Sequence, residues 1–274
     1  MAYPDPVAHD ELATSFGGVA DAYERGRPRY PPHVIDAIAR HAGGGPRLLD
    51  VGAGTGRLSV PLLAAGFDVV AVEPLDAMRA LLTEAVGPER ALAGRAEALP
   101  LGDADVDGAV CADAWHWFDG PRAADELHRV VRPGGGVVVC VLRQEWIEAG
   151  DGPIWWTRLG EILQPLWRAA DHPHVTEPRR PEGLERHPGF APLEVHEVRF
   201  DHAFDRDGMF AHHTSISVVA ALPRPRRAEV LAELEAILDD HGVDVAEVPY
   251  VAELWVTRRL PAPAPPAGPA AAAS

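Results

Sequence analysis

One short stretch, residues 48–58, constrains the fold of this chain more than any other. An apolar run enters it, glycines follow at positions 52, 54 and 56, and the residues after them have helical character. Glycine suits such a turn because it adopts backbone angles closed to residues with a Cβ and lets the backbone approach a ligand closely. The turn also delivers that ligand to the amide groups at the start of a helix. Alone it is a weak signal, because many dinucleotide-binding folds contain one.

Strands and helices alternate through the first half of the chain. The expected strands are short apolar runs at residues 47–51, 67–72, 90–93, 106–112 and 137–142, and the helices between them cover 55–65, 76–86 and 119–131. Such alternation is typical of βαβ units. The strands lack polar alternation, which suits a parallel sheet covered by helices on both faces. The sequence therefore predicts an α/β fold.

The second half follows a different pattern. We expect a Trp-rich helix over 154–169, an irregular loop over 171–190, helices over 208–222 and 225–240, and strands over 193–204 and 250–260. The chain then divides into an N-terminal cap arm (1–31), a core (32–143), a C-terminal half with lid helices and the last two strands (144–260), and a Pro/Ala-rich tail (261–274). The tail cannot bury apolar surface, so we expect it to be disordered.

Two acidic residues frame the glycine turn. Asp50 ends the first expected strand and Glu73 ends the second, and neighbouring parallel strands end at the same edge of a sheet. A carboxylate there can accept hydrogen bonds from both hydroxyls of a ribose, which selects a nucleoside ligand. A dinucleotide would bring its pyrophosphate to the turn, where Asp50 repels it. S-adenosylmethionine (SAM) would instead bring its ammonium group towards Asp50, so the arrangement favours SAM.

Four segments in this order resemble class I SAM-dependent methyltransferases. They are Leu-Leu-Asp-Val-Gly-Ala-Gly-Thr-Gly at 48–56, Val-Glu-Pro at 72–74, Ala-Glu-Ala-Leu-Pro at 96–100 and Leu-His-Arg-Val-Val-Arg-Pro-Gly-Gly at 127–135. A wider frame resembles the methyltransferase type 11 branch that includes trans-aconitate-methyltransferase-like enzymes: Tyr-Glu-Arg-Gly-Arg-Pro-Arg-Tyr-Pro at 23–31, Trp-His-Trp-Phe at 115–118 and Pro-Tyr-Val at 249–251. The resemblance implies a Rossmann-like seven-stranded sheet, mostly parallel with the last strand antiparallel, with helices on both faces and a helical lid.

The resemblance also implies roles for individual residues. It places Gly52, Gly54 and Gly56 along the methionine part of SAM. Arg95 stands where many relatives have an acidic residue, so this chain departs from the family pattern at the usual contact to the adenine amino group. The remaining implied cofactor contacts are Glu73 at the ribose, Pro74, Met78, Ala96 and Glu97 at the adenine, Asp50 and Asp113 near the methionine and reactive end, and Tyr23 and Arg27 closing over the cofactor. The alternative for the segment around Tyr23 is an amphipathic helix that only packs on the domain surface.

The chemistry of methyl transfer points to one candidate catalytic residue. Transfer from a sulfonium is an in-line displacement, in which the protein mainly aligns the acceptor and excludes water. We interpret the acceptor as an oxygen nucleophile; a hydroxyl needs a general base, whereas a carboxylate needs none. His116 follows the fourth expected strand at the ligand-binding edge, and imidazole titrates near neutrality. It is the candidate base, and the alternative is a histidine that only packs between Trp115 and Trp117.

The lid region contains further aromatic and basic side chains. Trp155, Trp156 and Trp167 either wall an acceptor pocket or form the core of a lid helix, and their helical spacing favours the core. We expect His212 and His213 on a helix surface rather than as metal ligands; with Arg199 they are candidate polar contacts of the lid. The sequence shows no convincing carboxylate set for a metal, so we expect no metal.

Composition narrows the partners and the compartment. The net charge is −16, and all 25 basic residues are arginine. An acidic chain is a poor partner for phosphate backbones and acidic membranes, no apolar run is long enough to span a bilayer, and the N-terminus lacks a signal-peptide pattern. We therefore expect a cytoplasmic, bacterial protein acting on a small molecule, without nucleic-acid or membrane partners. Cys111 and Cys140 lie in apolar runs and are expected to be buried thiols.

Two other functions stay open. The cofactor motifs also fit a SAM-binding regulatory protein that has no acceptor site. An NAD-dependent oxidoreductase fits the glycine turn, but Asp50 and the order of the strands disfavour it.

Overall fold

The computed structural model describes residues 20–43, 45–169 and 180–261. The expectations for residues 1–19 of the cap arm, for residues 171–179 of the expected loop and for residues 262–274 of the tail therefore lie outside the described residues.

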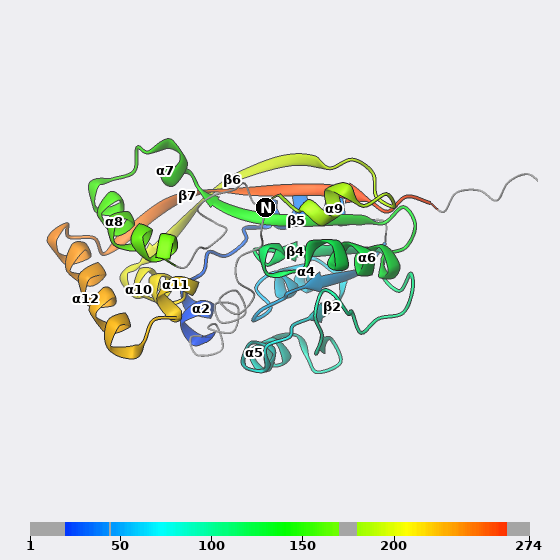
Figure 1. Ribbon diagram of the computed structural model, residues 1–274, viewed down its shortest axis with the longest axis horizontal. Helices are drawn as coiled ribbons and strands as arrows, with labels where there is room; N and C mark the ends of the chain where they lie inside the picture. Colours follow the sequence, from blue (N-terminus) through cyan, green and yellow to red (C-terminus); the bar gives the residue numbers. More distant parts are fainter. Residues whose placement is uncertain (1–19, 44, 170–179, 262–274) are drawn as a thin grey trace, which may run out of the picture.

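A seven-stranded sheet forms the centre of the described structure, in the order β3-β2-β1-β4-β5-β7-β6 (Figure 1). The first five strands run parallel, and β7 runs antiparallel to both of its neighbours. The strands are β1 Arg47–Val51, β2 Asp68–Val72, β3 Ala91–Leu92, β4 Gly108–Ala112, β5 Gly136–Gln144, β6 Glu194–Asp205 and β7 Val245–Arg258. The expected mostly parallel, Rossmann-like sheet is confirmed.

Helices cover both faces of this sheet because successive strand residues point to opposite sides. On β4, Val110 faces the cluster built from α3 (Pro32–Ala42) and α4 (Ser59–Ala64), beside which lies α5 (Asp76–Val86). Ala109 and Cys111 face the other cluster, which is built from α6 (Gly120–Val130) and α9 (Glu182–Arg186). Cys111 and Cys140 are buried free thiols, as expected.

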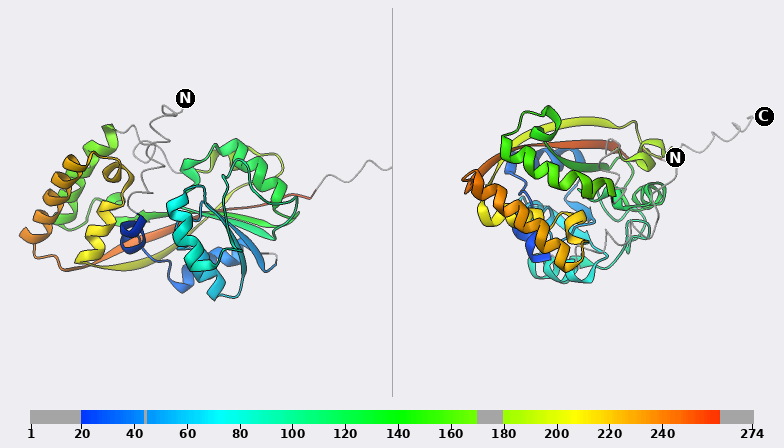
Figure 2. Two further views of the ribbon diagram at one scale, coloured as in Figure 1. Left: turned by 90° about the horizontal axis from the view of Figure 1, so that it is seen from below. Right: turned by 60° about the vertical axis from the view of Figure 1, so that its left-hand side comes forward.

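The remaining helices gather at one end of the sheet, on the left in Figure 1 and again separated from the core in Figure 2. They are α2 Ala20–Gly26, α7 Glu145–Ala149, α8 Ile154–Ala169, α10 Arg206–Thr214, α11 Ser217–Ala220 and α12 Arg224–Asp240. The long strands β6 and β7 carry the chain to this end, where α8 and α10 pack on α12. Helix α2, from the N-terminal arm, packs on α10. We call this group the lid helices.

Several boundaries differ from those expected. The helix expected over 55–65 begins only at Ser59, because the glycine turn occupies the preceding residues. The helix expected over 208–222 is two helices, since the chain leaves α10 at Ser215. It also begins at Arg206, where the Asp205 side chain accepts a hydrogen bond from the Gly208 amide. The expected loop at 171–190 contains α9.

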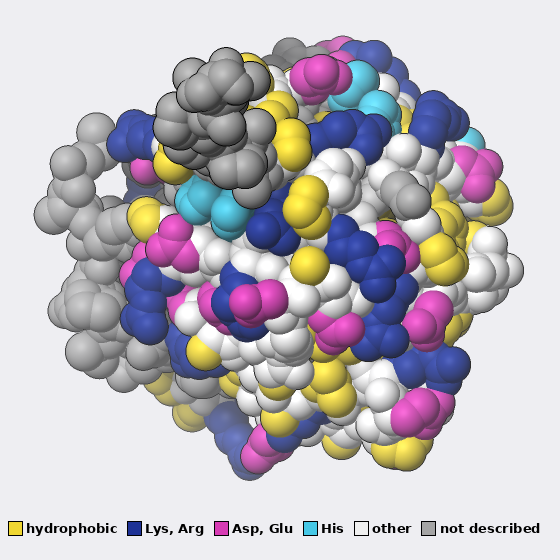
Figure 3. Space-filling view, turned by 90° about the vertical axis from the view of Figure 1, so that its right-hand side faces the viewer, with side chains coloured by type: hydrophobic (Ala, Val, Ile, Leu, Met, Phe, Trp, Pro, Cys, Tyr) yellow, Lys and Arg dark blue, Asp and Glu magenta, His cyan; other side chains and the backbone are white. Residues whose placement is uncertain are grey.

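The end of the molecule away from the lid helices shows basic and acidic side chains interspersed (Figure 3). At the amino ends of the parallel strands, Arg47 pairs with Asp105 at 3.6 Å, and Arg132 pairs with Asp107. In the part of the chain that the structure describes, no helix is both long and apolar enough to cross a bilayer.

Candidate functional site

A cavity of about 1200 Å³ opens at the carboxyl ends of the parallel strands, between the sheet and the lid helices. This is the edge at which open α/β sheets bind ligands. The cavity brings together nearly all the residues that the sequence predicted for the site. These are Tyr23, Arg27, Asp50, Gly52, Gly54, Glu73, Pro74, Met78, Ala96, Glu97, Asp113 and His116.

The glycine turn forms one wall, but only two of its glycines reach the cavity. Gly52 and Gly54 have positive φ angles of 69° and 58°, a region that favours glycine. A Cβ on Gly54 would meet only a Tyr23 ring carbon, at 3.9 Å, so this backbone faces open space. Gly56 is not part of the lining; a Cβ there would lie 3.0 Å from a Leu82 methyl group of α5. Gly56 thus faces α5 rather than the cavity, and its predicted place along the methionine part of SAM stays a prediction.

Asp50 is a buried carboxyl with one unused oxygen. Its side chain is 1% exposed, and its Oδ2 accepts a hydrogen bond of 2.6 Å from the Ser59 hydroxyl. Its Oδ1 is buried without a hydrogen-bond partner among the described residues. Burial raises the pKa of Asp50 to about 7, although the Ser59 hydrogen bond opposes the shift. A buried acceptor without a donor is costly, so this site fits a ligand that carries a donor such as an ammonium group.

Glu73 lies across the turn from Asp50 and is held by two backbone amides. Its Oε2 accepts from the Gly54 amide and its Oε1 from the Leu75 amide, both at 2.9 Å. Burial raises the pKa of Glu73, while the two amide hydrogen bonds lower it. Each carboxylate oxygen can accept more than one hydrogen bond, so both remain able to receive a ribose hydroxyl. Leu75 is also the N-cap residue of α5.

The loop after β3 forms the far wall of the cofactor part of the cavity. Ala96 is buried, and the Oε1 of Glu97 accepts a 2.8 Å hydrogen bond from the Asp119 amide. Arg95 pairs with the other oxygen of Glu97 at 3.5 Å. Glu97 is thus fixed, and the cation at position 95 partly neutralises it.

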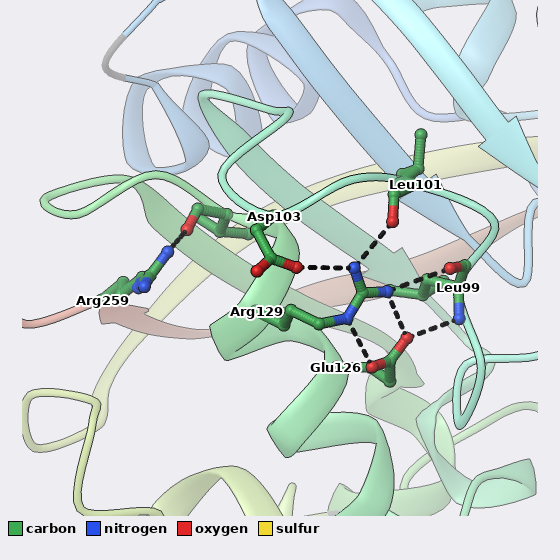
Figure 4. Close-up of polar contacts among 7 residues, drawn as sticks. Leu99, Leu101, Asp103, Glu126, Arg129 and Arg259 are labelled. Carbon is green, nitrogen blue, oxygen red and sulfur yellow. Dashed lines mark hydrogen bonds and ion pairs between the residues drawn. The ribbon is translucent and has the colours of Figure 1, made fainter.

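Arg129 of α6 supports this loop from behind (Figure 4). It donates hydrogen bonds to the carbonyls of Leu101 at 2.7 Å and Leu99 at 3.0 Å. Both carboxylate oxygens of Glu126 accept hydrogen bonds from the Arg129 guanidinium, and one of them also accepts a hydrogen bond of 2.7 Å from the Leu99 amide. The loop conformation therefore depends on one arginine–glutamate pair outside the cavity.

Arg57 is a residue of the site that the sequence analysis missed. Its side chain is only 9% exposed, and it donates to the backbone carbonyls of Glu24, Arg27 and Pro28 in the N-terminal arm. Thr55 adds a 2.6 Å hydrogen bond to the Glu24 carboxylate. These contacts bind the arm to the glycine turn. The only sequence signal was an arginine placed directly after the glycines.

The arm places Tyr23 and Arg27 in the cavity. The Arg27 guanidinium carbon lies 5.1 Å from the centre of the Tyr23 ring, and its Nη2 donates to the Ser215 carbonyl at 3.1 Å. Its Nε is buried with no hydrogen-bond partner in the described chain. Burial raises the pKa of Tyr23, and the charge of Arg27 opposes that shift. The segment is both a surface helix packed on α10 and a wall of the cavity.

Aromatic side chains surround the rest of the cavity. His116 lies in a 3-10 turn over Trp115–Trp117, with its ring centre 4.6 Å from that of Trp117. Trp156 and Trp167 line the cavity, whereas Trp155 is buried in the core. Trp156 and Trp167 also pack against that core, so the core interpretation is confirmed for the lid helix, and a role in an acceptor pocket stays a prediction.

Asp113, the residue directly after β4, has an unusual backbone conformation. Its φ is 48°, uncommon for a residue with a side chain. Its Oδ1 accepts a 3.0 Å hydrogen bond from the Leu142 amide of β5, which fixes the carboxylate at the edge of the sheet.

His212 and His213 differ most from expectation. They are 7% and 4% exposed and line the cavity, so their placement on a helix surface was wrong. Their apolar neighbours Met209 and Ile216, at helical spacing, were the available signal. Arg199 lies on β6 and pairs with Glu145 at 2.8 Å; it is not among the described residues that line the cavity.

A search of the described residues finds no group of three or more His, Cys, Asp and Glu side chains placed to hold a metal ion.

Part of the chain is similar in sequence to known methyltransferases. Residues 49–139 match the family described as "Methyltransferase domain". An uncharacterized methyltransferase of Mycobacterium tuberculosis is 44% identical over 153 residues, which are 56% of this chain and 60% of that protein. A malonyl-[acyl-carrier protein] O-methyltransferase of Pectobacterium atrosepticum is 35% identical over 135 residues, 48% of this chain and 53% of that one. The chain thus covers 60% or less of the length of these two curated relatives.

The fold is also found among solved structures. A protein assigned provisionally as a type II methyltransferase, from Anaeromyxobacter dehalogenans, is 26% identical and aligns with a TM-score of 0.58 over 86% of this chain and 99% of that one. Together with the strand order, this similarity shows that the chain has the Rossmann-like fold of class I methyltransferases, and residues 49–139 are similar to the methyltransferase-domain family.

Proposed function

We propose that this protein is a SAM-dependent methyltransferase that transfers a methyl group to an oxygen atom of a small molecule. The observation that carries the proposal is the pair of buried carboxyls, Asp50 and Glu73, on opposite sides of a glycine turn that faces a cavity. Asp50 offers a buried acceptor for the ammonium group of SAM, and Glu73 offers two oxygens for its ribose. The Asp50 carboxyl would repel a pyrophosphate at the turn, which argues against NAD, whereas Glu73 would suit the ribose of either cofactor.

The residues around the turn fit the rest of the cofactor. The Arg27 guanidinium, with its unpartnered Nε, supplies positive charge for the SAM carboxylate. Met78, Ala96 and Glu97 enclose the space for the adenine. Bound SAM supplies a methyl group on a positively charged sulfur, which is already activated for displacement.

The protein's own task is to align the acceptor and exclude water. The cavity continues beyond the glycine turn to Trp117, Trp156 and Trp167. This apolar extension provides room for an acceptor, which a non-catalytic SAM-binding protein would not need. An O-methyltransferase among the relatives supports oxygen as the acceptor atom, and we propose neither a nucleic-acid nor a membrane partner.

Calorimetric titration with S-adenosylhomocysteine tests the proposal. We expect the wild-type protein to bind it, and Glu73→Ala to weaken binding by about tenfold or more because two charge-assisted hydrogen bonds are lost. Glu229→Ala is the matched control, since Glu229 is an exposed residue of α12. Absence of binding to the wild-type protein would refute the proposal, and so would tight binding of NADH in its place.

The hydrogen bonds from Arg129 to the loop after β3 give a second prediction. Arg129→Ala removes the donors to the Leu99 and Leu101 carbonyls, so we expect the loop to loosen and the Kd for S-adenosylhomocysteine to rise by about 3–10-fold. Hydrogen exchange over residues 94–101 should increase in the same variant. Arg226→Ala, which breaks only two exposed ion pairs on α12, with Glu229 and Glu233, should change neither quantity. An unchanged Kd with faster exchange would show that the loop does not contribute to binding.

A further inference from the structure

We propose that His213, from lid helix α10, is the general base that accepts the proton of a hydroxyl acceptor. This inference rests on the proposed function and deepens it, because it makes the acceptor an alcohol or phenol rather than a carboxylate. The candidate that the sequence favoured, His116, would then be a residue of the cavity wall.

The first argument is the tautomer of His213. Its Nδ1 lies 2.7 Å from the Met209 carbonyl of the same helix. A carbonyl can only accept, so Nδ1 carries the proton and Nε2 carries the lone pair. Nε2 has no hydrogen-bond partner among the described residues. His213 is 4% exposed and lines the cavity, which leaves its acceptor nitrogen available to a ligand.

The second argument is the difference between the two neighbouring histidines. The Nδ1 of His212 bonds the Gly26 carbonyl at 3.1 Å and so ties α10 to the arm helix α2. The ring of His212 also packs against Phe204 of β6. His213 makes its hydrogen bond within its own helix and ties no other element. Ile216 and Ser217, three and four residues later, line the same cavity. His212 thus has a structural task, whereas the polar group of His213 has none outside the cavity.

The third argument is electrostatic. Burial lowers the pKa of His213, the Met209 hydrogen bond opposes this, and the charge of Arg27, the residue directly after α2, lowers it further. The neighbouring ring of His212 on α10, 5.3 Å away, also has a pKa well below the usual value because of burial. Both imidazoles are therefore neutral at pH 7, the form that can accept a proton.

The step balances as a displacement. As the acceptor oxygen forms its bond to the methyl carbon, its proton moves to Nε2 of His213. The carbon–sulfur bond breaks, and its electron pair stays on the sulfur, which becomes a neutral thioether. The imidazolium that forms lies near Arg27, so its proton is readily lost to solvent when the product leaves.

The assignment can be tested with pairs of acceptors that share the same ring system, one carrying a hydroxyl group and the other a carboxyl group. The indole-lined wall suits planar rings, so we would use 2-naphthol and 2-naphthoic acid, followed by other aromatic alcohols with their carboxylic counterparts. We expect His213→Gln to lower methyl transfer to the hydroxyl compounds by about 100-fold at pH 7 and to change transfer to the carboxylates less than about threefold. His116→Gln should retain most of the hydroxyl activity, and His241→Gln, an exposed residue after α12, should retain all of it.

The pH profile separates a base from a packing residue. For hydroxyl acceptors, kcat of the wild-type protein should fall at acidic pH as His213 takes up a proton, and the fall should come at a lower pH than for an exposed imidazole because burial lowers the pKa of His213. His213→Gln should lack this decrease. Imidazole added to His213→Ala should restore part of the rate. S-adenosylhomocysteine binding is the folding control for each variant and tests the proposed function separately. Methylation of carboxylates alone, or loss of the acidic decrease in His116→Gln rather than in His213→Gln, would overturn the assignment.

Discussion

The Asp50→Asn variant is expected to unfold about 5 °C above the wild-type protein at pH 8 and to bind SAM at least about tenfold more weakly. Asp50 is 1% exposed and has an oxygen without a partner among the described residues. An amide of the same shape keeps an acceptor for Ser59 and cannot ionise. At pH 8 the unfolded wild-type protein is stabilised by ionisation of Asp50. The unfolded variant has no such stabilisation, so its folded state is favoured.

The pH dependence of folding stability determines the sign of the expected change in unfolding temperature. The pKa of Asp50 is about 7 in the folded protein against the usual 3.8. The folded state thus holds a proton that the unfolded state releases, so the contribution of Asp50 to stability falls as the pH rises from about 4 to 7 and is constant above that. The two pKa values correspond to at most about 4 kcal/mol. The stability difference between the variant and the wild-type protein should grow over the same interval.

Thermal unfolding and calorimetry between pH 5 and pH 8 check both parts. The ammonium group of SAM favours ionised Asp50, so the affinity of the wild-type protein should rise across this range and that of Asp50→Asn should not. Asp244→Asn, on an exposed residue before β7, is the control. If Asp50→Asn binds SAM as tightly as the wild-type protein does, Asp50 does not contribute to the SAM site.

The order of elements could be predicted because it depends on local patterns. Apolar runs separated by helical segments predicted the parallel half of the sheet, and the resemblance in motif order predicted the antiparallel β7. The boundaries near residue 55 could not be predicted from periodicity, since Leu58 and Leu62 have helical spacing but the helix begins at Ser59. There the geometry of the glycine turn decides the structure.

The site was predictable where residues lie near strand ends and unpredictable where distant segments meet. Asp50 and Glu73 follow from the common edge of neighbouring parallel strands. The burial of His212 depends on a contact with Gly26, 186 residues away in sequence. No local pattern in either segment encodes that contact, so the histidines resembled surface residues. The same holds for Arg57, whose partners precede it by about thirty residues.

Arg57→Ala is expected to release the N-terminal arm and to weaken S-adenosylhomocysteine binding by about tenfold or more. The guanidinium donates to three backbone carbonyls and pairs with Glu24 at 3.6 Å. Its removal leaves carbonyls of the arm without donors, at a cost of about 2–4 kcal/mol. Tyr23 and Arg27 then lose their fixed positions over the glycine turn, which is why binding should decrease together with stability.

Limited proteolysis distinguishes a released arm from a general loss of stability. Trypsin cleaves after arginine, and Arg25 and Arg29 are exposed in the arm, so Arg57→Ala should be cut there faster while the rest of the chain stays resistant. Arg57→Lys should resemble the alanine variant, because one ammonium group cannot replace a planar guanidinium that spans three carbonyls. Arg226→Ala should behave like the wild-type protein. If cleavage of the arm accelerates but the Kd for S-adenosylhomocysteine is unchanged, the arm is a structural element and does not close over the cofactor.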